Sequence, residues 1–309
     1  MVVPYRYGAD WHTAPLEPGF CSWRAQLWNR DSIPFHLWDP GPIARALREF
    51  RPDVVDIHEE PYWPSGGELA WVARRHPVVM YTAQNIVKHL PLPIAMMQRA
   101  VLRRARACYP CSHGAAGVLR RRGFRGPINV VPLGVDDELF TVQRRGQRVG
   151  FVGRFVPEKG VDELLHFGAQ LLAVGDGPLA PVVRRAGGEV RRARTINDLA
   201  HALSEMAVLV APSRTTATWK EQFGRMVIEA MAAGVPVVAS DSGSLPEVVG
   251  DAGVIVAEGD SKALRDAVER VSAEPGDLGE RGRTRARTLY TWDAVAERME
   301  HVYRMAIAA

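Results

Sequence analysis

Cysteine is scarce in this chain of 309 residues, which contains only three. A small, odd set argues against a secreted protein held together by disulfides. Cys108 and Cys111 have the spacing of a thiol–disulfide redox site, and the simpler interpretation is two small residues at a strand end in a reducing compartment. No apolar run approaches the about 20 residues that a bilayer crossing needs, and the start does not resemble a signal peptide. We therefore expect a cytoplasmic protein.

Acidic residues are absent from positions 69–135, where eleven basic residues occur. Residues 1–145 contain 19 Lys or Arg and 13 Asp or Glu, a balance of +6, whereas residues 146–309 contain 20 and 22, a balance of −2. A one-signed surface can attract nucleic acid or an anionic membrane, or can simply be solvated. Because no nucleic-acid-binding motif accompanies the basic stretch at 99–125, we expect no nucleic-acid partner and consider an anionic membrane surface the better candidate.

The order of the chain predicts an α/β protein, because short Val-rich strands alternate with helical segments. We expect an N-terminal domain at 1–143, a second domain at 147–289 and a C-terminal helix at 290–309 that packs back on the first domain. A polar linker is expected at 141–147, and residues 1–40 have no readable period. The expected strands are 53–58, 77–82, 148–152, 171–174, 207–211 and 235–240. The expected helices are 43–50, 68–75, 96–107, 115–122, 161–167, 178–187, 197–205, 224–233, 245–249 and 261–272.

Two glutamates flank the predicted start of a helix near Gly224. Glu221 and Glu229 stand eight residues apart, which places them about 80° apart around a helix and so not on one face. If Glu221 instead lies in the preceding loop, the unpaired N–H groups at the helix start form an anion site suited to a nucleotide diphosphate. The alternative is an amphipathic helix with two solvated glutamates.

A second motif follows the predicted strand at 148–152. Gly153 and Arg154 end that strand, and Lys159 comes five residues after the arginine. The glycine spacing fits neither a dinucleotide fingerprint nor a P-loop. Two cations at a strand end can hold a diphosphate from two sides, and the alternative is ordinary surface charge. The turn at 174–178, Val-Gly-Asp-Gly-Pro, is a weaker signal.

Together these motifs resemble the retaining glycosyltransferases of family 4. The likeness runs from residue 149 to about 300 and includes Ala-Met-Ala-Ala-Gly-Val-Pro-Val-Val after Glu229, while residues 53–61 and 131–136 extend it into the first half. The resemblance implies a GT-B fold, in which two Rossmann-like domains face a central cleft. The first domain here is expected to lack its opening strand and glycine-rich loop.

The resemblance also implies roles for individual residues. Arg154 and Lys159 would neutralise the diphosphate, and Glu221, the third member of the catalytic set, would bind the hydroxyls of the transferred sugar. Glu229 would accept hydrogen bonds from the nucleotide ribose. The implied donor-binding set is Gly153, Arg154, Lys159, Glu221, Phe223, Gly224, Arg225, Met226, Val227 and Glu229. His58 and Gln84 are candidates for the acceptor side; a histidine often stands at the position of Gln84.

The activity that the resemblance implies is retaining transfer of a hexose from a nucleotide diphosphate sugar to a glycan or lipid-linked acceptor, in the synthesis of cell-surface polysaccharide or glycolipid. No metal and no other cofactor are expected, because fixed cations and a helix start would stabilise the leaving diphosphate. The protein would be cytoplasmic, with peripheral attachment to the inner membrane face. The alternatives are an inactive donor-binding remnant and a basic module that binds membrane or nucleic acid.

Overall fold

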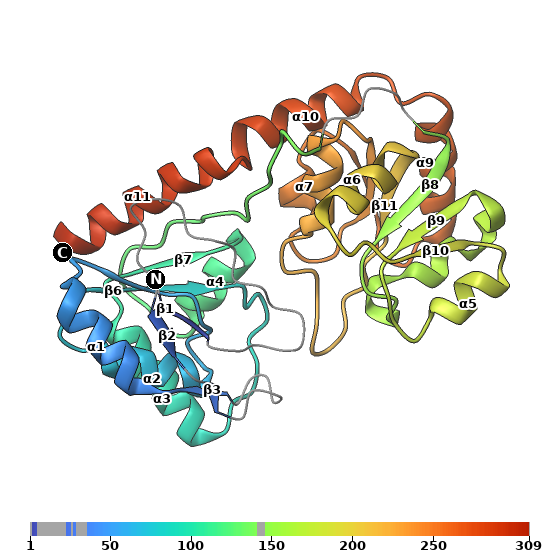
Figure 1. Ribbon diagram of the computed structural model, residues 1–309. Helices are drawn as coiled ribbons and strands as arrows, with labels where there is room; N and C mark the ends of the chain where they lie inside the picture. The colour runs from blue at the N-terminus through green and yellow to red at the C-terminus, as the bar shows by residue number, and fades with distance from the viewer. Residues whose placement is uncertain (1, 5–22, 26, 29–35, 141–145, 309) are drawn as a thin grey trace. The chain divides into compact units, whose positions relative to one another are not determined.

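The computed structural model describes residues 2–4, 23–25, 27–28, 36–140 and 146–308, and it divides into two compact units (Figure 1). Unit 1 consists of Met1–Cys111, Ala115–Val130 and Arg298–Ala309. Unit 2 consists of Ser112–Gly114 and Val131–Glu297. Most of the expected linker, at 141–145, lies outside the described residues.

A six-stranded parallel sheet forms the centre of unit 2 (Figure 1). The order of its strands is β10-β9-β8-β11-β12-β13. β8, the first of them in the chain, lies between β9 and β11, so the direction in which strands are added reverses there. In open α/β sheets ligands bind outside the carboxyl ends of the strands at such a reversal. The strands are β8 (Arg148–Val152), β9 (Leu171–Val174), β10 (Glu189–Arg191), β11 (Met206–Ala211), β12 (Val237–Ser240) and β13 (Val254–Val256).

Helices cover this sheet, and apolar side chains between the layers form the core. Every residue of β9, β11 and β12 is buried, as expected for inner parallel strands covered on both faces. In α7, every residue after Arg225 is buried. The helices of unit 2 are η1 (Pro157–Lys159), η2 (Val161–Gln170), α5 (Ala180–Arg185), α6 (Ile196–Ser204), α7 (Arg225–Ala232), α8 (Leu245–Val249), α9 (Ser261–Ala273) and α10 (Leu278–Leu289).

The sequence predictions hold for the inner strands of unit 2 and fail at its edges. β8 and β9 have the predicted bounds, 148–152 and 171–174. The edge strands β10 and β13 were not predicted; each has three partly exposed residues, too few to produce a readable period. The helix predicted at 161–167 is instead the 3₁₀ segment η2, which is kinked at Gly168.

Unit 1 contains a parallel sheet with the order β5-β6-β7 and four helices from the first half of the chain. The helix predicted over 96–107 is α3, but it begins earlier, at Leu92, and ends earlier, at Arg104. Ala105 has an extended backbone conformation, and β7 begins at Ala107. The elements are α1 (Pro40–Phe50), β5 (Val55–Ile57), α2 (Pro64–Val72), β6 (Val78–Thr82), α3 (Leu92–Arg104), β7 (Ala107–Pro110) and α4 (His113–Arg121).

Cys108 lies in β7, and Cys111 follows its last residue. Neither is in a disulfide, and both are buried. Burial raises the pKa of the Cys108 thiol well above its usual value, whereas a reactive thiol needs a lowered pKa. These observations favour the structural interpretation over the redox one.

The opening segment contains strands that the sequence did not indicate. β1 (Val2–Pro4) pairs in parallel with β2 (Trp23–Ala25), and β3 (Leu27–Trp28) pairs antiparallel with β4 (Leu37–Trp38). Strands of two or three residues are too short for a periodic pattern. In the part of the chain that the structure describes, β1 pairs only with β2 and is not part of the β5-β6-β7 sheet. Residues 5–22 lie outside the described residues, so the expected lack of an opening strand and glycine-rich loop stays a prediction.

The C-terminal helix α11 (Trp292–Ala308) belongs to unit 1 from Arg298 onward. There the Tyr303 hydroxyl donates a hydrogen bond of 2.7 Å to Oδ2 of Asp56 in β5, and the Tyr109 hydroxyl donates to Oδ1 of the same carboxylate. Asp56 therefore ties β7 and the C-terminal helix to β5. In the parts of the chain that the structure describes, no helix is both long and apolar enough to cross a bilayer.

Candidate functional site

The carboxyl ends of the central strands of unit 2 bring the predicted site residues together. Gly153 and Arg154 follow β8, Ser213 follows β11, and Ser240 ends β12. The Ser240 hydroxyl donates to the Ser213 carbonyl at 2.5 Å, which fixes the chain as it leaves β11. The candidate site therefore lies where the strand order reverses.

Lys159 is held at this site by the tight turn that follows β8. Its Nζ lies 2.6 Å from Oε2 of Glu221 and 5.0 Å from the centre of the Trp219 ring. Gly160 makes the approach possible, because it has φ +67° and a Cβ there would lie 2.0 Å from the Pro212 carbonyl oxygen. Only 14% of the Lys159 side chain and 7% of the Glu221 side chain are exposed, so this ion pair is well shielded from water.

Glu221 lies in the loop before α7, as the loop alternative predicted. Its Oε2 also accepts a hydrogen bond of 2.9 Å from the buried Ser213 hydroxyl, and its carbonyl accepts one of 3.1 Å from the Ser244 N–H. Gly243 packs directly against it, since a Cβ on that glycine would lie 2.0 Å from the Glu221 carbonyl oxygen. The backbone and the carboxylate of Glu221 are thus both fixed.

This packing predicts a large effect for Gly243→Ala. Gly243 and Gly259 both have positive φ, at +60° and +81°, but no atom lies within 4 Å of a Cβ built on Gly259. Gly259→Ala should therefore cost only the about 1–2 kcal/mol of the left-handed conformation. Gly243→Ala should destabilise the protein more, because Glu221 must also move. Equal losses in denaturant unfolding of the two variants would contradict this packing role.

The helix predicted to start near Gly224 begins at Arg225, with Gly224 as a left-handed N-cap residue of φ +88°. Phe223 before it is buried and packs edge-on against Tyr290 at 5.9 Å between ring centres. The Val227 N–H already donates to the Gly224 carbonyl at 2.8 Å. Gly234 ends this segment with φ +72°, the predicted left-handed cap.

Glu229 is buried within α7, apart from the Lys159–Glu221 pair. Its Oε1 accepts a hydrogen bond of 3.0 Å from Nε of Arg225, one turn earlier. Burial raises the pKa of the Glu229 carboxyl, and the arginine opposes this only in part. A buried carboxylate with a single cationic partner retains capacity to accept hydrogen bonds.

Arg154 has a different environment from Lys159. Its side chain is 62% exposed and lies 3.7 Å from Glu158, a contact that solvent screens. The two cations of the predicted clamp are therefore each paired with a different carboxylate. Lys159 is the one that the fold fixes, while Arg154 retains freedom to move.

Sequence reasoning did not assign roles to Ser213, Trp219 and Gly243, although all three contact the Lys159–Glu221 pair. Ser213 carried a weak signal, because a polar residue directly after a buried strand points to the edge where ligands bind. Trp219 and Gly243 carried none, since their contacts depend on how two loops pack.

His58 and Gln84 lie in unit 1, after β5 and β6. The His58 ring stacks on Tyr81 at 4.0 Å between ring centres. Gln84 is buried, and its Nε2 donates to the Ile86 carbonyl at 2.6 Å. The side-chain amide of Gln84 thus donates a hydrogen bond within its own loop.

Solved structures with similar folds define the class. Sucrose-phosphate synthase from Thermosynechococcus elongatus aligns with a TM-score of 0.77 at 22% identity, over 100% of this chain and 88% of that one. HepE from Anabaena, solved in complex with UDP, aligns with a TM-score of 0.71 at 18% identity, over 85% and 80% of the two chains. The fold is therefore GT-B, as the sequence predicted.

Family models identify the family itself. Residues 13–139 match the model described as Glycosyltransferase Family 4, and residues 146–274 match the one described as Glycosyl transferases group 1. This chain belongs to the family 4 glycosyltransferases.

Two curated relatives are named as glycosyltransferases. The MMP α-(1→4)-mannosyltransferase of Mycolicibacterium hassiacum is 35% identical over 201 residues, which are 59% of this chain and 49% of that protein. The D-inositol 3-phosphate glycosyltransferase of Mycobacterium tuberculosis is 28% identical over 311 aligned positions, covering 86% of this chain and 65% of that protein. The chain thus spans about half of the length of the first relative and just under two thirds of the length of the second.

Proposed function

We propose that this protein is a retaining glycosyltransferase that moves a hexose from a nucleotide diphosphate sugar to a glycan or lipid-linked acceptor in the synthesis of cell-surface polysaccharide or glycolipid. The observation that carries the proposal is the shielded Lys159–Glu221 pair, fixed by Ser213 at the strand-order reversal of a family 4 chain. The relatives named as mannosyl- and glycosyltransferases support a sugar as the transferred group.

In this proposal the two members of the pair act on different parts of the donor. The Lys159 ammonium has three N–H donors, of which one points at Glu221; the others would bind the diphosphate. Glu221 would accept hydrogen bonds from sugar hydroxyls while Ser213 keeps it oriented. Arg154, which is exposed, would move onto the diphosphate when the donor binds.

Departure of the nucleoside diphosphate would be assisted by these cations and by the start of α7. Both are fixed before the reaction, so they need little reorganisation as charge develops on the leaving group. No metal ion is required in this scheme. The proposal is tested by incubating the full chain with a panel of nucleotide sugars and EDTA. We expect release of a nucleoside diphosphate from at least one of them. The proposal would be refuted if no nucleotide sugar of the panel were bound and none released a nucleoside diphosphate.

The raised pKa of Glu229 predicts a pH dependence for nucleotide binding. An ordinary glutamate has a pKa of about 4.3. Because burial raises the pKa of Glu229, its carboxyl takes up a proton at a higher pH than an ordinary glutamate does. Protonation removes acceptor capacity toward the ribose, so affinity should fall as the pH is lowered toward 5. Titrations of a nucleoside diphosphate between pH 8 and about pH 5 check this. The Glu229→Gln variant should bind more weakly at pH 8 and should keep only the part of the pH dependence that comes from protonation of the ligand's own phosphate, at about pH 6. A pH profile identical to that of the unchanged protein would contradict the ribose role.

We also propose that the protein is cytoplasmic and associates peripherally with an anionic membrane through the acid-free interval 69–135. Basic residues near such a surface contribute about 1 kcal/mol each, and salt screens this attraction beyond about 8 Å at physiological ionic strength. Co-sedimentation with vesicles rich in phosphatidylglycerol is therefore expected in low salt and should be lost at roughly half-molar salt. Equal sedimentation with phosphatidylcholine vesicles would show that charge does not drive the association.

A further inference from the structure

A hollow of about 510 Å³ lies in unit 1, where α3 and α4 end. We call it the arginine hollow. Five arginines line it and no acidic residue does; the lining residues are Arg99, Leu102, Arg103, Ala105, Arg121, Arg122, Gly123, Phe124, Arg125 and Gly126. It lies in a different unit from Lys159 and Glu221, so its role is independent of the proposed donor site.

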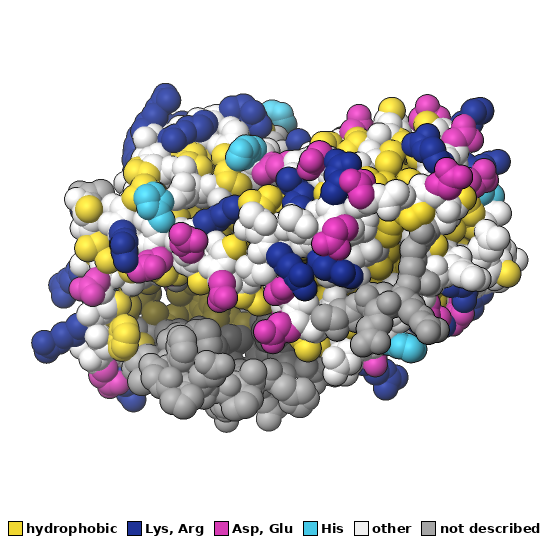
Figure 2. Space-filling view, turned by 90° about the horizontal axis from the view of Figure 1, so that it is seen from above, with side chains coloured by type: hydrophobic (Ala, Val, Ile, Leu, Met, Phe, Trp, Pro, Cys, Tyr) yellow, Lys and Arg dark blue, Asp and Glu magenta, His cyan; other side chains and the backbone are white. Residues whose placement is uncertain are grey.

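The arginines of the hollow differ from those of unit 2 in how their charge is balanced. Basic and acidic side chains lie next to one another at several places on the face that Figure 2 shows, and within unit 2 several of them form ion pairs. Pairs of this kind are Arg148–Glu189, Arg191–Glu205 and Arg214–Asp162. Within the described residues, none of the five arginines that line the hollow forms an ion pair with a carboxylate. Their charges therefore repel one another without compensation.

Some arginines of this region have a structural role. Arg104 donates to the carbonyls of Arg74 and His76, and Arg120 donates to those of Phe124 and Gly126. Basic residues near the C-terminus of a helix also complement the negative end of its dipole, and this explains the presence of one or two of the arginines. Arg122, in the hollow itself, donates to the Lys88 carbonyl.

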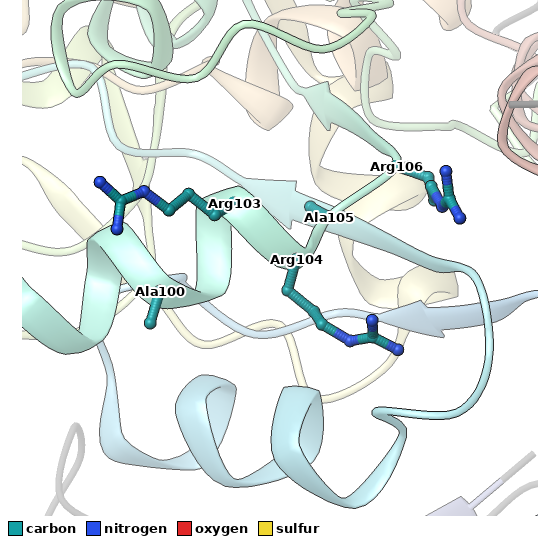
Figure 3. Close-up of a pocket in the computed structure, with 5 residues that line it drawn as sticks. All are labelled: Ala100, Arg103, Arg104, Ala105 and Arg106. Atoms are coloured by element: carbon teal, nitrogen blue, oxygen red, sulfur yellow. The ribbon is translucent and has the colours of Figure 1, made fainter.

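Four arginines of the hollow make no specific polar contact: Arg99, Arg103, Arg121 and Arg125 have no hydrogen-bond or ion-pair partner among the described residues. Arg103 and Arg121 lie in the last turns of α3 and α4, where their charge complements the helix dipole. Figure 3 shows that Arg103 leaves the end of α3 in a different direction from Arg104. A neighbouring hollow of about 580 Å³ shares Arg103 and Ala105 with the arginine hollow, so this guanidinium has space on its exposed side.

We propose that the arginine hollow is a binding site for a ligand that carries two phosphate groups. A guanidinium presents its N–H donors as a planar fork that matches phosphate oxygens. A phosphate monoester carries about −1.5 to −2 charges at pH 7, so two of them balance the four unpaired arginines. A single carboxylate would leave most of that positive charge uncompensated.

Two sources can supply such phosphates, a soluble polyphosphate or the headgroups of lipids. Leu92 and Met96 bear on this choice because they are 74% and 64% exposed. At 3.6 residues per turn, they lie within about 60° of Arg99 and Arg103 around the axis of α3. These two exposed apolar side chains, on the same face of α3 as the arginines, would allow the site to contact a bilayer.

The experiment uses the full chain carrying Arg154→Ala and Lys159→Ala, so that the proposed donor site contributes as little as possible. Binding of tripolyphosphate is measured by calorimetry in low salt. Adding Arg99→Gln and Arg103→Gln should weaken binding at least tenfold. The matched control adds Arg184→Gln and Arg185→Gln, two exposed arginines of α5 in unit 2, and should change the affinity less than twofold.

A second arm identifies the source of the phosphates with phosphatidylcholine vesicles that contain phosphatidic acid. If Leu92→Ser/Met96→Ser weakens vesicle binding and leaves tripolyphosphate binding intact, the ligand is a lipid headgroup. If the vesicles do not compete with tripolyphosphate, the ligand is soluble. The proposal is overturned if neither probe binds, or if the Arg184/Arg185 control loses as much affinity as the Arg99/Arg103 variant.

Discussion

Replacing Lys159 by alanine is expected to abolish most of the affinity for a nucleoside diphosphate. The shielded ammonium would make charge-assisted hydrogen bonds to the diphosphate, each of which contributes about 1.5–3 kcal/mol. Loss of one such bond weakens binding by roughly 10- to 150-fold, since 1.4 kcal/mol is a factor of ten. Arg154→Ala should have a smaller effect, because that side chain is largely exposed, and the double variant should lose the most.

Lys262→Ala is the matched control for this prediction. Lys262 is an exposed lysine that is also paired with a carboxylate, Asp266, on α9, so it tests whether loss of a positive charge alone weakens binding. Affinities are measured by titration with EDTA present, and unfolding curves show whether each variant is folded. An Arg154→Ala/Lys159→Ala variant that binds as tightly as the unchanged protein would remove the basis for a donor site in unit 2.

Glu221 and Glu229 are expected to affect different steps. Glu221→Gln keeps the shape of the side chain but removes the charge that faces Lys159, so sugar transfer and donor hydrolysis should fall by about 10- to 100-fold, equivalent to one hydrogen bond to a charged group. Affinity for the nucleoside diphosphate should change little, because that ligand lacks the transferred sugar that Glu221 would bind. Glu229→Gln should weaken the nucleotide itself by a similar factor.

The comparison between the two glutamate variants is internally controlled. Both side chains are buried, and each is paired with one cation, so a general loss of stability would affect both in the same way. Rates are measured at saturating donor, and nucleoside diphosphate affinity is measured separately. Identical losses in the rate and in the affinity for both variants would show that the roles assigned to them are wrong.

Much of the fold was determined by the sequence alone. The strands β8 and β9 were predicted with the correct bounds. In β9 every residue is apolar and buried, as a strand covered on both faces must be. The alternative in which Glu221 lies in a loop and a helix starts near Gly224 is confirmed, because α7 begins at Arg225 with Gly224 as its N-cap residue. The positive φ of Gly224 is one that glycine adopts without strain. Both signals are local: the residues that carry them are the residues that form the element. Edge strands such as β10 lack this constraint and were missed.

The candidate site was decided by the tertiary structure. The Lys159–Glu221 pair joins residues 62 positions apart, and neither residue's neighbours in the chain indicate that they meet. The contact forms because Gly160 allows the turn after β8 to pack against Pro212 at the end of β11, while Gly243 allows a third loop to press against Glu221. These close approaches depend on the order of the strands in the sheet. That order minimises the free energy of the whole core, so it is a property of the packed molecule and of no single segment.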